Sequence, residues 1–180
     1  MGLAERFERA VNRNILWRFF LNAETTISVG CAIVGVLGVC YNVITRYILH
    51  KNFFGMDDLL AIVMIYMYFL GCAFASYDRQ QIKADILSSF VKNPFKSSVL
   101  RAFQEVFSAA VCGLYTVWLA EYVYFNFESG SVTSVLKCPQ WVPQASLLIG
   151  FFFMTVYHSY NGIFDTLSAI DISRERKGAS

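Results

Sequence analysis

Apolar residues along the chain gather in four long runs that are separated by short polar connections. The clearest run extends from Leu59 to Tyr77 and contains no charged side chain. As a helix it would be about 28 Å long, close to the thickness of the hydrocarbon core of a bilayer. Backbone groups in lipid have no water to bond, so each run is predicted to be a helix. The pattern predicts spans at residues 24–47, 58–78, 102–125 and 140–162.

The third run is the shortest of the four. It reads VFSAAVCGLYTVWLA and is bounded by Glu105 and Glu121. Apolar residues continue on both sides, so the two glutamates are expected near the membrane interfaces. A buried helix of a soluble protein is the alternative for any single run. Four such runs in 180 residues favour a membrane protein.

The segment before the first span has an amphipathic pattern. Apolar residues recur every four positions and charged residues take the opposite face. This predicts a helix over residues 1–22 that lies in the inner membrane interface, anchored by Trp17 and Arg18. A soluble amphipathic helix packed on a partner is the alternative. The apolar positions are Leu3, Phe7, Val11, Ile15 and Phe19.

The connection between the second and third spans has a similar, shorter stripe formed by Ile82, Ile86 and Phe90, which ends at Asn93-Pro94. It predicts a short helix in the membrane plane. Residues 172–180 are expected to form a flexible tail. No connection is long enough for a separate domain, so residues 1–180 are predicted to form a single all-α membrane domain.

Positive charge is distributed unevenly between the two sides of the membrane. Of the 15 Lys and Arg residues, 12 fall in the N-terminal segment, the second-to-third connection and the tail. The other two connections hold only Arg46, Lys51 and Lys137. Loops rich in Lys and Arg remain in the cytoplasm. Both termini are therefore predicted to be cytoplasmic, with Asp57 and Asp58 on the outer side.

Composition supports membrane placement and excludes some classes of partner. Hydrophobic residues make up 56% of the chain, aromatic residues 17% and charged residues only 16%, and the mean hydropathy is +0.47. A soluble domain of this length would carry more charge. The net charge of +2 is too small to indicate nucleic-acid binding.

The sequence contains no pattern for a cofactor, a metal or a catalytic site. Its five cysteines are scattered and form no CxxC pair. The two histidines, His50 and His158, are expected at opposite membrane faces and cannot both ligate one haem. His158 is instead expected in the inner aromatic belt with Tyr157 and Tyr160.

In the membrane core, away from the ends of the spans, the polar side chains are Asn42, Thr116 and Thr155 at most. Transporters that move their own substrate usually carry an ionisable group or a broken helix near the midplane. The spans instead contain small residues four positions apart, which suits close helix packing. The chain is therefore predicted to be a packing subunit. The small-residue pairs are Ser28/Ala32, Gly71/Ala75 and Ala109/Gly113.

Three stretches together resemble the small membrane subunit of tripartite ATP-independent periplasmic (TRAP) transporters, the DctQ type. They are Arg46 followed by Asp57-Asp58, then YFLGCAFASYDRQQIKADIL, then SVLKCPQWVPQASLLIGFFFM. The chain departs from the family pattern at Gln81, where a His is frequent, and in having aspartates where glutamate is commoner. The resemblance suggests partner or scaffold contacts at Arg46, Asp57, Asp58, Gly71, Asp85, Pro139, Trp141 and Gly150.

The resemblance implies a bacterial inner-membrane protein that is not an enzyme and needs no cofactor. Such transporters import an organic-acid anion with a sodium gradient. A periplasmic binding protein captures the anion, and a large multi-span subunit carries it in an elevator-like motion. The small subunit would join the static scaffold of the large one and help to receive the binding protein. Its basic inner surface would contact anionic phospholipid.

Three questions stay open from the sequence. Asp57 and Asp58 could cap the second helix alone, or could cap it and contact a partner. The chain could instead be the membrane anchor subunit of a quinone- or haem-dependent redox complex, or a small channel or exporter formed by identical copies. The sequence does not identify the transported anion.

Overall fold

The computed structural model describes residues 11, 13, 15–50, 55–78, 94–133 and 135–178. This part of the chain is dominated by four long helices, with one isolated β-bridge between Val132 and Pro139. All four helices are long and apolar enough to cross a membrane, which confirms the all-helical prediction with four candidate spans. The helices are α2 (Ile15–Tyr47), α3 (Met56–Tyr77), α5 (Pro94–Ser129) and α6 (Trp141–Gly178).

Two predicted boundaries differ from the structure. Helix α2 runs from Ile15 into the first span without a break, so the predicted separation near residues 22–24 is absent. Residues 15–29 contain no glycine or proline to interrupt the helix. Helix α6 continues to Gly178, so most of the predicted tail is helical. The rest of the predicted interfacial helix, and the in-plane helix expected between spans two and three, lie outside the described residues.

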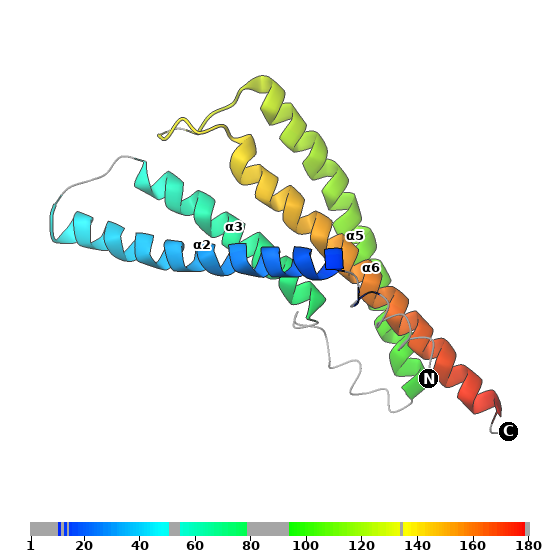
Figure 1. Ribbon diagram of the computed structural model, residues 1–180. Coiled ribbons are helices and arrows are strands. Elements are labelled where there is room, and N and C mark those ends of the chain that lie inside the picture. The colour runs from blue at the N-terminus through cyan, green and yellow to red at the C-terminus, as the bar shows by residue number, and fades with distance from the viewer. Residues whose placement is uncertain are drawn as a thin grey trace.

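The helices form two antiparallel pairs, α2 with α3 and α5 with α6, and the two pairs contact each other through α3 and α6, as Figure 1 shows. The α5–α6 pair extends beyond the Tyr77 end of α3 (Figure 1), because α3 has 22 residues and α6 has 38. We call the end that carries the connections at residues 48–55 and 130–140 the outer end, after the predicted orientation.

Glycines allow the closest approaches between helices. A Cβ at Gly150 would lie 2.8 Å from Cβ of Phe69 and 3.0 Å from its carbonyl oxygen, so only glycine fits where α6 meets α3. Gly71 faces Ser28, whose hydroxyl donates to the carbonyl of Met67 at 3.3 Å. Close packing of α2 and α3 through small residues is thus confirmed for Ser28 and Gly71.

Most of the apolar surface faces outward. Only five hydrophobic residues among those described are buried, and three of them, Ala73, Met154 and Tyr157, form a small core cluster. Helices α2 and α5 expose large apolar side chains over most of their length, including Leu37 and Phe127, each 65% exposed. Such a surface is suited to lipid and to helices of a membrane partner.

Candidate functional site

The connection between α5 and α6 folds into a compact loop at the outer end. The backbone N–H of Thr133 donates to the carbonyl of Cys138, and that of Gln140 donates to Ser131, both at 2.8 Å. Lys137 adopts a left-handed conformation with φ of 51°. These bonds bring the two halves of the loop together around the bridge between Val132 and Pro139, and we call residues 130–140 the outer loop.

Asp58 holds the outer loop against the start of α3. Its Oδ2 accepts hydrogen bonds from the backbone N–H groups of Leu136 at 3.1 Å and Val135 at 3.3 Å. Beside it, Gly55 has φ of 91°, and a Cβ there would lie 2.6 Å from Cδ1 of Leu136. The Leu136 side chain could turn aside, but any residue with a side chain at position 55 would be strained by the positive φ.

Asp57 bonds in another direction. Its Oδ1 accepts a hydrogen bond from Nδ2 of Asn42 on α2, at 2.8 Å. The N-cap of α3 is Gly55, and the cap makes no side-chain hydrogen bond. The expectation that the two aspartates cap α3 is therefore wrong for hydrogen bonding, because each carboxylate bonds to a neighbouring segment. Both still lie in the first turn, where the helix dipole favours negative charge.

The other predicted residues of the outer end surround this loop. Arg46 is exposed in the last turn of α2, and Pro139 is exposed in the β-bridge. Trp141 begins α6 and packs edge-on against Phe127, with ring centroids 5.9 Å apart. Together with Asp57 and Asp58, these residues lie in or beside the outer loop and the adjoining helix ends.

Two predicted residues lie elsewhere. Gly150 is buried against Phe69 of the same chain, so it is not on a surface that a partner could reach. Gly71 is half-buried and faces α2. Asp85 is outside the described residues. Of the two predicted interfacial anchors, Arg18 is exposed and Trp17 is half-buried in an aromatic cluster.

Asp58→Ala should loosen the outer loop. It removes two hydrogen bonds to a charged acceptor, and we expect a loss of about 1 kcal/mol of local stability, since both bonds are long and partly exposed. Hydrogen exchange at the amides of Val135 and Leu136 should rise by about fivefold. Asp57→Ala is the matched control and should leave these two amides unchanged. Equal exchange in both variants would show that Asp58 does not hold the loop.

A second polar cluster, which the sequence did not predict, joins all four helices near the inner end of α3. The Tyr157 hydroxyl donates to Oε2 of Glu24 on α2 at 2.5 Å. Nδ1 of His158 lies 2.7 Å from Oε2 of Glu105 on α5. We call this cluster the inner polar layer; its third contact is the bond from Nδ2 of Asn161 to the carbonyl of Ser76 on α3, at 3.0 Å.

Burial makes the inner polar layer energetically important. Glu24 is 3% exposed, Glu105 2%, His158 5% and Asn161 2%. Polar groups in such places need hydrogen-bond partners, because each unpaired group loses its hydration without compensation. Tyr157, His158 and Asn161 all belong to α6 and bond to α2, α5 and α3 respectively. Helix α6 therefore connects the other three helices.

Aromatic rings surround the layer from one side. Trp17 packs on Tyr77, Tyr157 and Tyr160, with ring centroids 5.4–6.1 Å apart. Tyr157 is 1% exposed. The expectation that Tyr157 and His158 belong to a lipid-facing aromatic belt is therefore wrong: both are buried between helices, and Tyr157 belongs to the aromatic cluster.

The layer also corrects the expectation that the spans hold only Asn42, Thr116 and Thr155 as polar groups. Glu105 was placed near an interface, yet it is buried against His158. The sequence feature that could have predicted this layer is the presence of acidic side chains beside the apolar runs, because ionisable residues in or near a span usually face another helix. Among the described residues, no group of three or more His, Cys, Asp or Glu side chains could hold a metal ion.

The structure thus defines a multi-span helical membrane protein with a folded outer loop and a buried polar layer. The family described as tripartite ATP-independent periplasmic transporters, DctQ component, matches residues 35–165. This match covers most of the chain, so the chain belongs to that family and is a small-subunit component of a TRAP transporter. In these systems the component works with a large membrane subunit and a periplasmic binding protein. A comparison with curated proteins gives no match.

Proposed function

We propose that the chain is the static scaffold subunit of a sodium-driven TRAP transporter that imports an organic-acid anion, a carboxylate or a sulfonate. The match to the DctQ family over residues 35–165 carries this proposal. A large elevator subunit moves the anion, and a periplasmic binding protein delivers it. The test is sodium-driven uptake by the complete transporter in vesicles, compared with vesicles that lack this chain.

The contacts between helices support a static role. Helix α6 is tied to α3 at two levels, by the bond from the Tyr66 hydroxyl to the carbonyl of Val142 at 2.8 Å and by the inner polar layer. The close contact at Gly150 lies between these levels. Helices bonded at two separate levels resist sliding past each other, which suits a subunit against which another one moves. The exposed apolar faces of α2 and α5 supply surface for lipid and for the large subunit.

The charge distribution supports placement in the bacterial inner membrane with both termini in the cytoplasm. Lys137 in the outer loop would then face the periplasm, and Arg174 near the end of α6 would face the cytoplasm. With the five native cysteines replaced by serine, an impermeant thiol reagent added to intact cells should label Lys137→Cys and leave Arg174→Cys unlabelled until the membrane is opened. The reverse labelling pattern would overturn this orientation.

The outer loop is the surface that we propose for the binding protein. It is fixed by Asp58 and presents exposed Val135, Leu136 and Lys137. A folded loop loses less conformational freedom on binding than a mobile one. Since the Asp58 carboxylate already bonds to the loop, it supports this surface, whereas exposed Asp57 and Lys137 are the charges more available to a partner. If the binding protein docks on this loop, its presence should protect Lys137→Cys from the thiol reagent.

A further inference from the structure

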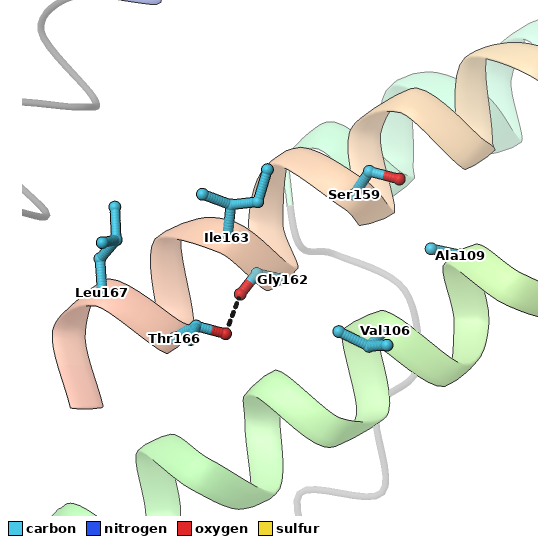
Figure 2. Close-up of a pocket in the computed structure, with 7 residues that line it drawn as sticks. All are labelled: Val106, Ala109, Ser159, Gly162, Ile163, Thr166 and Leu167. Carbon is cyan, nitrogen blue, oxygen red and sulfur yellow. Dashed lines mark hydrogen bonds between the residues drawn. The ribbon is translucent and has the colours of Figure 1, made fainter. Parts of the chain in front are cut away.

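An apolar groove lies between α5 and α6 on the inner half of the molecule, and the scaffold role does not use it. Figure 2 shows its lining, with two residues from α5 and five from α6. Its volume is about 330 Å³, roughly ten times the ~30 Å³ share of one water molecule in the liquid. The lining residues are Val106, Ala109, Ser159, Gly162, Ile163, Thr166 and Leu167.

The lining has no hydroxyl left without a partner. Thr166 donates to the carbonyl of Gly162 at 2.7 Å (Figure 2), and Ser159 donates to that of Thr155, also at 2.7 Å. Both bonds lie within α6, so the groove surface is essentially hydrocarbon. A polar ligand would lose hydration without compensation there, whereas an apolar chain would not.

In the orientation proposed above, the groove lies at the inner leaflet. Ser159 and Leu167 lie about 27 and 39 Å along α6 from Trp141 at its outer end, counted at 1.5 Å per residue. The hydrocarbon core is about 30 Å thick and a tilted helix crosses it over a longer path. The groove therefore lies where acyl chains of the inner leaflet approach their headgroups.

Beyond the groove, the same face of α6 changes from apolar to cationic. Ile163 is followed seven residues later by Ile170, which is 40% exposed, and Leu167 is followed seven residues later by exposed Arg174. Residues seven apart lie on one helix face, about 10 Å along the axis. Two acids lie near Arg174 along α6: Glu175, which follows it in the sequence, and Asp171, which is half-buried and has an interaction of its own.

We propose that this groove is a binding site for an anionic phospholipid of the inner leaflet. One acyl chain lies between α5 and α6 against Val106, Ala109 and Ile163. The headgroup phosphate lies beside Arg174, whose charge complements it. The lipid fills the space between the two helices where the α5–α6 pair extends beyond α3, and so supports that extension.

The experiment measures lipid retained by the full-length chain. The chain is reconstituted in vesicles of phosphatidylethanolamine and phosphatidylglycerol, transferred to mild detergent and examined by native mass spectrometry. Ser159→Phe and Ala109→Leu fill the groove. Each should lower the amount of retained lipid by about tenfold. A side chain that keeps two methylene groups of the acyl chain out of the groove already lowers lipid affinity by about this factor. Thr26→Phe, at an exposed site on α2, should retain lipid as the wild type does.

The headgroup contact has its own variant. Arg174→Gln should lower the preference for phosphatidylglycerol over phosphatidylethanolamine by about fivefold while the total retained lipid changes little. Arg101→Gln removes the same charge from α5, about 140° around the helix from Val106, and should preserve the preference. Unchanged retention in both groove-filling variants would overturn the proposal. The same variants are also purified from cells together with the large subunit; loss of the large subunit with lipid still bound would also overturn the proposal, because a protein helix would then be the occupant.

Discussion

His158→Leu should lower the unfolding temperature of the protein by about 10 °C, which corresponds to a loss of roughly 3–5 kcal/mol. The substitution removes the ring nitrogen that lies 2.7 Å from Oε2 of Glu105. Both side chains are at least 95% buried. A buried carboxylate that loses a hydrogen-bonding partner keeps its desolvation penalty without the compensating contact.

The double variant Glu105→Leu/His158→Leu separates this explanation from simple loss of packing. Replacing both members of a buried polar pair by apolar residues is often close to neutral. We therefore expect the double variant to be more stable than His158→Leu alone, although it carries one more substitution. Thermal unfolding of the purified protein, followed by loss of the folded monomer at matched heating rates, measures both variants.

Thr155→Val is the matched control for the same pair of helices. The hydroxyls of Thr155 and Thr116 lie 3.4 Å apart between α6 and α5. This contact is neutral and long, so its loss should change stability by less than about 1 kcal/mol. If His158→Leu lowers the unfolding temperature no more than Thr155→Val, the inner polar layer does not hold the helices together in the way described.

The four spans were predictable from the sequence because each depends on one local property, a long apolar run. The contact between Ser28 and Gly71 was partly predictable, since small residues at four-residue spacing indicate a packing face. The pairing of particular helix faces was not predictable, because the hydrophobic effect gives an apolar helix in lipid no preference for one neighbouring helix over another. Helix ends were also missed: α2 and α6 both continue beyond the apolar part of their sequences.

The polar contacts were the least predictable part of the site. Glu105 and Glu121 border the same apolar run, yet Glu121 is exposed and Glu105 is buried against His158, 53 positions away. Likewise, the amides that bond Asp58 belong to residues 77 and 78 positions away. A carboxylate at a helix start looks like a cap in sequence, and only the folded loop shows that it has another partner.

Omitting this chain from a reconstituted transporter should abolish sodium-driven uptake. Members of the DctQ family work with a large membrane subunit and a periplasmic binding protein in TRAP systems. In the proposed arrangement the large subunit moves against a fixed support, and this chain supplies that support through α6 and the contacts that tie it to α2, α3 and α5. Without it the large subunit lacks its scaffold, and the binding protein lacks part of its docking surface.

The most direct measurement compares three sets of proteoliposomes. One set contains this chain alone, one contains the large subunit alone, and one contains both. All three receive the binding protein loaded with a labelled organic-acid anion that this protein binds. With an inward sodium gradient, only the set with both subunits should accumulate the anion, and collapsing the gradient should stop it. Anion flux through this chain alone, or full uptake by the large subunit without it, would contradict the scaffold function.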